Sequence, residues 1–222
     1  MAKSDAAVLI TSTQPRAEKF VYDLQSDGME ALACPALLVQ TVETPMPQGE
    51  FDAMLITSSH VLHTSLPLHL PAIAIGEETA RQAQDMGLDI TQTGYDNLQS
   101  MDLSAYTSIL YPCAMQPSLI PPHTTPWALY HTIANPEFTI PPATEIICLF
   151  SVKGAQAVKP HCRRDHTILC LSQAIADVFD NHPIDNLAVC ARPRYDTMKE
   201  LIKKRVYAHD AYRRNERCRK TD

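Results

Sequence analysis

The chain of 222 residues carries 19 Lys and Arg against 25 Asp and Glu, and 45% of its residues are hydrophobic. This length fits one large domain or two small ones, and the hydrophobic content is sufficient for ordinary buried cores. No run approaches the roughly 18 to 20 apolar residues of a membrane span, and the N-terminal apolar run is too short for a signal peptide, so we expect a cytoplasmic protein without a membrane partner.

The seven cysteines form an odd set without a Cys-x-x-Cys pair. Three of them, Cys148, Cys170 and Cys190, lie within expected strands, where a free cysteine behaves as a small apolar residue. We therefore expect reduced thiols in buried cores rather than disulfides.

Charge is distributed unevenly along the chain. From Arg192 onward there are 11 basic and 5 acidic residues, whereas the preceding part holds 8 basic and 20 acidic residues. A basic tail of this kind can contact RNA, membrane lipids or an anionic partner. A solvated last helix that frays into a tail explains the same composition, and this is the interpretation we prefer, so we expect no nucleic-acid partner.

In chain order, the first predicted unit is a strand at 8–12 followed by a helix with Thr13 as its N-cap. Residues 31–43 are then extended and apolar, but Pro35 interrupts them because a proline cannot donate to a central ladder. We therefore expect residues 36–43 to form a strand that crosses between two halves of the chain.

The clearest pattern is 72–87, which reads AIAIGEETARQAQDMG. Its alternating apolar residues predict a short buried strand, Gly76 ends that strand, and the two following glutamates suit the first turn of a helix. Gly87 then ends the helix. A strand, a tight loop and a helix make half of a parallel βαβ unit.

Three consecutive segments of this kind recur later in the chain. Residues 51–65, 72–87 and 90–101 match residues 145–158, 167–181 and 187–201 in plan and in order. Their shared order predicts two similar α/β halves.

The segment 114–126 cannot be helical, because its four prolines are too closely spaced. The following apolar segment, 127–133, can run back beside the first crossing strand, and the N-terminal βα unit then belongs with the C-terminal third. The predicted organisation is a discontinuous α/β domain of 1–35 and 136–222, an inserted α/β domain of 44–126, and linker strands at 36–43 and 127–135. Because only two linker strands would join the halves, we expect hinge motion between them. The space between the halves is the expected ligand-binding site.

Hydroxyls, small residues and one lysine follow the expected strands. They are Thr11 and Ser12; Thr57, Ser58 and Ser59; Gly76 and Thr79; Ser151 and Lys153; and Ser172. Together with free N–H groups at helix N-termini they outline a polar cleft for a ligand with many carboxylates or phosphates. Helix capping alone explains each position taken singly.

Several sharper chemistries are not supported by the sequence. There is no G-x-G-x-x-G after a strand, no Walker loop and no G-x-S-x-G elbow. The pair His60 and His63, and the pair Cys162 and His166, lack an evident third metal ligand, so we expect no metal site and interpret the first pair as exposed.

The order of the segments resembles that of a known family. The residues that carry the resemblance are VLITSTQPRAEKFVYDLQSDGMEALACPALLVQ, ITSSHVL, IAIGEETARQAQDMG, ILYPC, ALYHTI, CLFSVKGAQAV, CLSQAIADVF and RPRYDTMKELIKK. Over nearly the whole chain this order is similar to that of the uroporphyrinogen-III synthases of tetrapyrrole biosynthesis. The resemblance implies two flavodoxin-like α/β domains with parallel sheets, one of them discontinuous, joined by a two-stranded β-ladder.

The resemblance also implies a reaction. Linear hydroxymethylbilane, a small-molecule substrate with eight carboxylates, loses water and closes to uroporphyrinogen III with its last pyrrole ring inverted, without cofactor or metal. The family view is that an azafulvenium forms, that ring D attacks through its substituted carbon, and that the resulting spiro intermediate fragments and recloses. Such chemistry depends on positioning, because the unassisted chain closes without inversion.

The resemblance implies that Tyr130, on the return crossing, donates a proton to the leaving hydroxyl. The positions that match substrate-binding residues of the family are Ser58, Gly76, Thr79, Ser151 and Ser172. An aromatic residue packed beside Trp127 is an equally good explanation of Tyr130.

Two departures from the family pattern support a second hypothesis. Gln14-Pro15 stands where the family often has Thr-Arg-Pro, and the Pro-rich 114–126 replaces a helix. We therefore expect a monomeric uroporphyrinogen-III synthase, with the alternative of a non-catalytic two-domain hinge protein that binds a tetrapyrrole or another polyanion.

Overall fold

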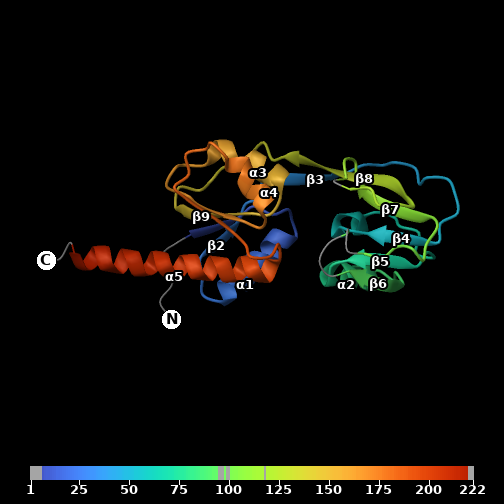
Figure 1. The fold of residues 1–222 in the computed structure, drawn as a ribbon, viewed down its shortest axis with the longest axis horizontal. Coiled ribbons are helices and arrows are strands. Elements are labelled where there is room, and N and C mark those ends of the chain that lie inside the picture. The colour runs from blue at the N-terminus through green and yellow to red at the C-terminus, as the bar shows by residue number, and fades with distance from the viewer. Residues whose placement is uncertain (1–6, 95–97, 99–100, 118, 220–222) are drawn as a thin grey trace. The chain divides into compact units, whose positions relative to one another are not determined.

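The computed structural model describes residues 7–94, 98, 101–117 and 119–219 of the chain (Figure 1). It divides into two compact units, which we call unit 1 (Met1–Leu38 and Ala134–Asp222) and unit 2 (Val39–Ile133). The short helix expected near 95–101 falls largely outside the described residues.

Unit 1 is built on a five-stranded parallel sheet with helices on both faces. In sheet order its strands are β2 (Ala31–Ala33), β1 (Ala7–Ile10), β9 (Thr144–Leu149), β10 (Thr167–Cys170) and β11 (Asn186–Val189). The helices are α1 (Arg16–Ser26), α3 (Val152–Val158), α4 (Gln173–Ala176) and α5 (Tyr195–Arg219), with short 3-10 turns η3 (Lys159–His161) and η4 (Asp177–Phe179).

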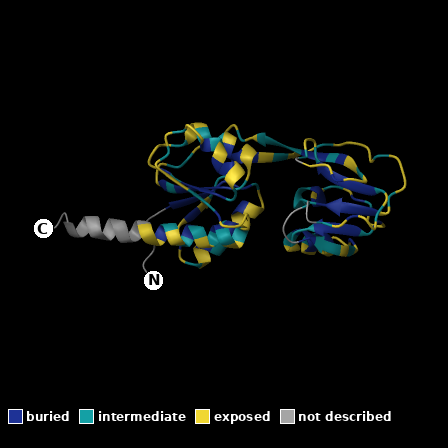
Figure 2. Ribbon diagram, in the orientation of Figure 1, coloured by how far each residue is buried: buried dark blue, intermediate teal, exposed yellow. Residues whose placement is uncertain are grey.

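Alternation along the strands sorts the side chains of unit 1 into two cores. Val8 and Ile10 of β1 face α1 and α5, where Met198 and Ile202 are buried against them. Leu9, between them, faces α3 and α4 on the opposite side. Both faces of each central strand are therefore dry, as expected for a parallel sheet (Figure 2).

Unit 2 contains a six-stranded sheet. In sheet order its strands are β3 (Leu37–Thr41), β8 (Thr124–Ala134), β7 (Ile109–Ala114), β4 (Ala53–Ile56), β5 (Ala72–Ile75) and β6 (Ile90–Gly94). The strands from β8 to β6 run parallel. The 3-10 helix η1 (Ser59–His63) and α2 (Glu77–Asp85) cover one face.

The other face of the unit 2 sheet carries Leu55, Ile73, Tyr111 and their neighbours. Loop residues, Leu103 among them, pack on this face, and residues 115–117 and 119–123 of the Pro-rich segment are not helical. The prediction that this segment is not a helix is confirmed for its described residues. Its last residues, from Thr124, already belong to β8.

Strands β3 and β8 are neighbours in the sheet. Val42 N donates to Leu129 O at 2.8 Å, and Asn135 N donates to Ala36 O at 2.9 Å, so the two strands run antiparallel. Pro126 lies in the earlier part of β8, beside β7 and before the residues that face β3. Its missing N–H therefore costs no ladder hydrogen bond on that side.

The two sheets have the same arrangement of strands. In unit 2 the order β6-β5-β4-β7-β8 corresponds position by position to β11-β10-β9-β1-β2 of unit 1. The internal repeat predicted from the sequence is thus present, with the last two positions filled in unit 1 by the start of the chain. In each sheet the strand order reverses at one point, between β9 and β1 and between β4 and β7, and ligands of open α/β sheets bind at such points.

The segment 72–87 folds as predicted. Gly76, with φ 88°, turns the chain from β5 into α2, and Gly87, with φ 91°, follows the helix.

The N-cap prediction for Thr13 was wrong, because α1 begins later, with Pro15 at the N-cap position. The Thr13 carbonyl instead accepts from Ala17 N at 3.1 Å.

The final helix α5 continues to Arg219, within the basic tail. The six cysteines with described side chains are all free, and burial raises the pKa of Cys170 to about 12 and that of Cys190 to about 11. Among the helices of the described residues, none combines the length and apolar character that a membrane crossing requires.

Candidate functional site

In unit 1, Thr11 and Ser12 follow β1 at the point where the strand order reverses. The Thr11 hydroxyl donates to Cys148 O at 2.7 Å, which ties β1 to β9 and leaves only its oxygen for a ligand. The Ser12 hydroxyl lies 3.3 Å from the hydroxyl of Tyr195, the first residue of α5. Ser12 therefore belongs to a small polar group at this edge, whereas Thr11 is mainly structural.

Ser151, Lys153 and Ser172 lie at the same edge of the unit 1 sheet, because they follow the neighbouring strands β9 and β10. Ser151 caps α3, since its Oγ accepts from Gly154 N at 3.0 Å. Lys153 is exposed in the first turn of that helix. Ser172 takes the N-cap position of α4 but makes no capping hydrogen bond with its side chain. The capping explanation thus holds for Ser151 and fails for Ser172.

In unit 2, Thr57 follows β4 at the corresponding reversal point. Its hydroxyl lies 3.3 Å from the hydroxyl of Tyr111, which β7 contributes from the neighbouring position in the sheet. Burial raises the pKa of Tyr111, and the hydrogen bond from Thr57 partly opposes this shift. The Tyr111 phenol is therefore neutral at physiological pH and able to donate a hydrogen bond.

Ser58 and Ser59 begin the turn after β4. The Ser58 side chain caps η1 by accepting from His60 N at 3.3 Å, and Ser59 is half-buried as the first residue of η1. This turn carries the half-buried His60 to the ring of Tyr130, with ring centroids 5.4 Å apart. The expectation that His60 and His63 form an exposed pair was therefore wrong for His60, although His63 is exposed.

Tyr130 owes its position to an irregularity in β8. Cys113 pairs with Ala128 but Ala114 pairs with Tyr130, so β8 carries Leu129 as one extra residue against β7. A bulge of this kind re-aims the side chains that follow it. Tyr130 is 9% exposed and packs in one apolar cluster with Trp127 and Leu129, so the packing explanation describes it well.

Gly76 and Thr79 lie after β5, one strand further along the same edge. Gly76 N is already used, because it donates to Gly94 O at 2.7 Å. Thr79 is 4% exposed within the first turn of α2. The backbone N–H of Gly76 is therefore not free for a ligand, and the contribution of this residue that the structure shows is its positive φ.

The described residues contain no cluster of three or more His, Cys, Asp or Glu side chains suited to a metal ion. In the second pair considered from sequence, His166 is fully buried and its Nδ1 accepts from Arg163 N at 2.9 Å. That nitrogen is therefore committed to the backbone.

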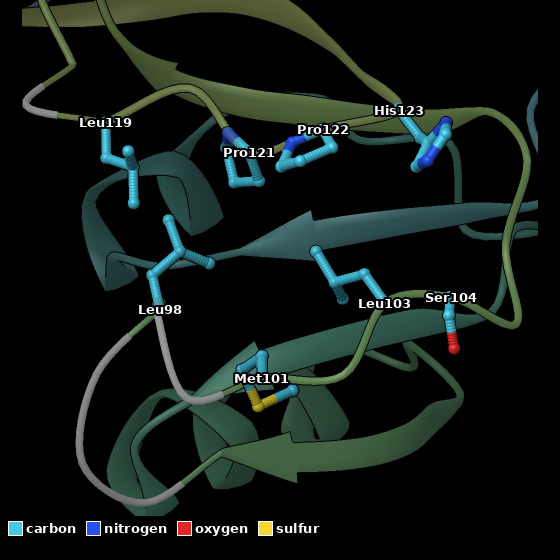
Figure 3. Close-up of a pocket in the computed structure, with 8 residues that line it drawn as sticks. All are labelled: Leu98, Met101, Leu103, Ser104, Leu119, Pro121, Pro122 and His123. Atoms are coloured by element: carbon cyan, nitrogen blue, oxygen red, sulfur yellow. The ribbon is translucent and has the colours of Figure 1, made fainter.

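Unit 2 also contains a pocket of about 440 Å³ on the face of its sheet opposite η1 and α2 (Figure 3). The pocket lies between two groups of side chains, and its lining is mainly leucine, methionine and proline. One group is Leu98, Met101, Leu103 and Ser104, and the other is Leu119, Pro121, Pro122 and His123. None of the residues expected to bind substrate lines it. Ser104 and His123 are the polar members of this mainly apolar lining, and the predicted substrate-binding residues lie elsewhere, so we place the site at the strand ends instead.

Solved structures with a similar fold include two tetrapyrrole-pathway enzymes. A uroporphyrinogen-III synthetase from Helicobacter pylori superposes with a TM-score of 0.60 at 14% identity, over 90% of this chain and 99% of the other. A mutant uroporphyrinogen III synthase from Thermus thermophilus superposes with a TM-score of 0.51 at 15% identity, over 92% and 99%. This chain has the uroporphyrinogen-III synthase fold. The resemblance noted from the sequence is thus confirmed at the level of the fold, whereas no family model and no curated protein matches the sequence.

Sequence reasoning missed four residues at these strand ends. In unit 2, Tyr111 meets the predicted Thr57 and His60 meets the predicted Tyr130. In unit 1, Tyr195 meets the predicted Ser12, and Arg16 meets Tyr195. Tyr111 lies within the quoted segment ILYPC and Tyr195 within RPRYDTMKELIKK. The sequence feature that could have indicated Tyr111 and Tyr195 is a tyrosine close to a predicted strand end. The sequence alone does not distinguish such a site tyrosine from one that is buried in the core.

Proposed function

We propose that this protein is a uroporphyrinogen-III synthase, a cytoplasmic monomer that cyclises hydroxymethylbilane with loss of water and inversion of ring D. The observation that carries the proposal is the pair of equivalent sheets, each ending in hydroxyl groups at its reversal point, within a fold that superposes over 90% of the chain on a uroporphyrinogen-III synthetase. Hydroxyls and helix N-termini suit a substrate whose carboxylates have to be held at many points.

In the proposed reaction, Tyr130 donates a proton as the hydroxyl of the bilane leaves as water. A neutral phenol suits this step, because a general acid has to carry its proton at the working pH. The azafulvenium is then attacked by the substituted carbon of ring D, and the spiro intermediate fragments and recloses. Thr57, Ser58, Ser59 and Thr79 in unit 2, and Ser12, Ser151, Lys153 and Ser172 in unit 1, hold the carboxylates.

The test is a coupled assay in which hydroxymethylbilane is supplied by its own synthase and the oxidised products are separated by chromatography. We expect mainly the type III isomer. A mixture no richer in type III than the enzyme-free control would mean spontaneous closure and would refute the proposal.

A second function, the non-catalytic binder, is favoured by one observation: Thr11, Ser58 and Ser151 already use their hydroxyls for backbone contacts. Such a protein would bind the tetrapyrrole without closing it. Calorimetry with uroporphyrin separates the two, because binding without isomer selectivity supports the binder and the absence of binding excludes it.

A further inference from the structure

Two phenylalanine rings hold one tyrosine in place at the carboxyl edge of the unit 1 sheet. The ring of Tyr195 stacks on that of Phe150, with centroids 5.2 Å apart and planes inclined at 14°. Phe20 of α1 meets both rings edge to face, at 5.4 Å from Tyr195 and 5.7 Å from Phe150. Contacts of this kind fix the tyrosine ring, and with it the place of its hydroxyl.

This tyrosine holds an arginine. The guanidinium carbon of Arg16 lies 5.2 Å from the centroid of the Tyr195 ring, and Nη1 donates to the Tyr195 hydroxyl at 3.4 Å. The Ser12 hydroxyl lies 3.3 Å from the same tyrosine oxygen. A guanidinium has five N–H donors in a planar fork, so most of its donors remain for a further partner.

The charge of Arg16 is not neutralised within the described part of the chain, where no carboxylate forms an ion pair with it. Glu18 lies in the same helical turn without forming such a pair. Arg16 is moreover the first residue of α1, where the helix dipole favours negative charge and disfavours a cation. The charge of Arg16 at this position therefore lowers the stability of α1. A residue that lowers stability in this way is often one that serves binding.

Further cations lie at the same edge. Lys153 stands in the first turn of α3, and Arg192 and Arg194 follow β11 directly before α5. By contrast, α2 of unit 2 begins with two glutamates, the ordinary choice for a helix N-terminus. The sequence predicts hydroxyls, small residues and one lysine at the strand ends, and the fold adds arginines at the same edge.

We propose that Arg16 and Ser12 bind a carboxylate of the substrate, and that Tyr195 is the positioning residue that holds both. The inference rests on the proposed function for the identity of the substrate, a linear tetrapyrrole with carboxylate side chains. Arginine suits this role because its fork matches a carboxylate with two parallel hydrogen bonds.

The test compares Arg16→Gln with Arg164→Gln in the full chain. Arg164 is exposed, pairs with Asp185 and precedes β10, at the opposite edge of the same sheet, so its substitution removes the same charge away from the site. Uroporphyrin serves as the probe, and its Kd is measured by calorimetry at low and moderate salt. We expect Arg16→Gln to weaken binding about tenfold and to reduce its salt dependence, and Arg164→Gln to change Kd by less than about twofold.

Two more variants separate positioning from direct contact. Arg16→Lys keeps the charge and should restore part of the affinity, and Tyr195→Phe should raise KM in the coupled assay while kcat stays near that of the wild type. Equal Kd values for the wild type and Arg16→Gln, with the type III isomer still formed, would overturn this inference and leave the proposed function standing. Weaker binding by Arg16→Gln in a protein that forms only the type I isomer would refute the proposed function and retain the anion site.

Discussion

The rings of His60 and Tyr130 meet edge to face, with centroids 5.4 Å apart and planes inclined at 63°. His60 comes from the turn after β4, and Tyr130 comes from the bulged end of β8, on the far side of β7. The contact therefore links the two sides of the reversal point in unit 2 through one aromatic pair.

Replacing Tyr130 with Phe should lower kcat about a hundredfold in the coupled assay, because the proton donor is lost while the ring and its packing remain. The thermal midpoint should change little. Tyr106→Phe is the matched control, since Tyr106 is a half-buried tyrosine of the same unit whose hydroxyl contacts Thr91 at 3.4 Å. Unchanged turnover in Tyr130→Phe would remove Tyr130 from the mechanism.

Replacing His60 with Ala should lower kcat about tenfold, since Tyr130 loses the ring that meets its edge and samples more orientations. His60→Phe keeps an aromatic ring at this place and should recover most of the rate. His63→Ala is the control from the exposed end of the same turn. Equal rates for both alanine variants would show that the contact is only structural.

Gly76→Ala should destabilise the protein by about 1–3 kcal/mol, because φ 88° with ψ 134° is a backbone conformation that residues with a Cβ avoid. No steric clash adds to this cost, since the nearest atom to an added Cβ is Thr79 Oγ1 at 3.9 Å. Chemical denaturation gives the measurement. Glu77→Ala, at the next position, should cost less than about 1 kcal/mol, and a similar loss in both variants would contradict the backbone explanation.

His166 should make the stability of unit 1 depend on pH. Burial lowers the pKa of this imidazole, and the positive charge of Arg163 lowers it further. The backbone N–H of Arg163 also donates to Nδ1. The unfolded chain therefore takes up the proton first, so stability is present above about pH 6.5 and declines as the pH falls below that value. His166→Asn keeps an acceptor for Arg163, and urea titrations across this range should show a flatter decline; an unchanged slope would exclude His166.

Asp27 should contribute stability that is lost in acid. Its carboxylate lies 2.7 Å from Lys199 Nζ and 3.0 Å from Lys203 Nζ, and the hydrogen bonds from these lysines hold its pKa below the ordinary value. Because the folded pKa is depressed, the contribution is present at neutral pH and disappears as the pH falls through the folded pKa.

Asp27→Asn should therefore lower the thermal midpoint near neutral pH, and its midpoint should converge with that of the wild type in acid, once the pH lies below the folded pKa of Asp27. Asp23→Asn, on the same helix, is the control with the same change of charge. A difference between Asp27→Asn and the wild type that is the same at both pH values would mean that the ion pairs to α5 do not carry the effect.

Local sequence determined the elements and their order. The segment 72–87 carried its strand, its two glycine turns and its helix in its own residues, and it folded as predicted because alternation, helical spacing and left-handed φ values depend on near neighbours. The same holds for Pro35, which separates β2 from β3. Repetition of such segments was sufficient to predict two similar α/β halves.

Only the tertiary structure decided which side chains meet at the strand ends. Thr57 and Tyr111 are 54 residues apart and Ser12 and Tyr195 are 183 apart, and they meet because the order of strands in each sheet places their carboxyl ends together. The bulge that positions Tyr130 likewise depends on the register of β8 against β7, a contact between distant parts of the chain. Local propensity carries no information about such register, so the sequence determined the units and long-range packing decided the site.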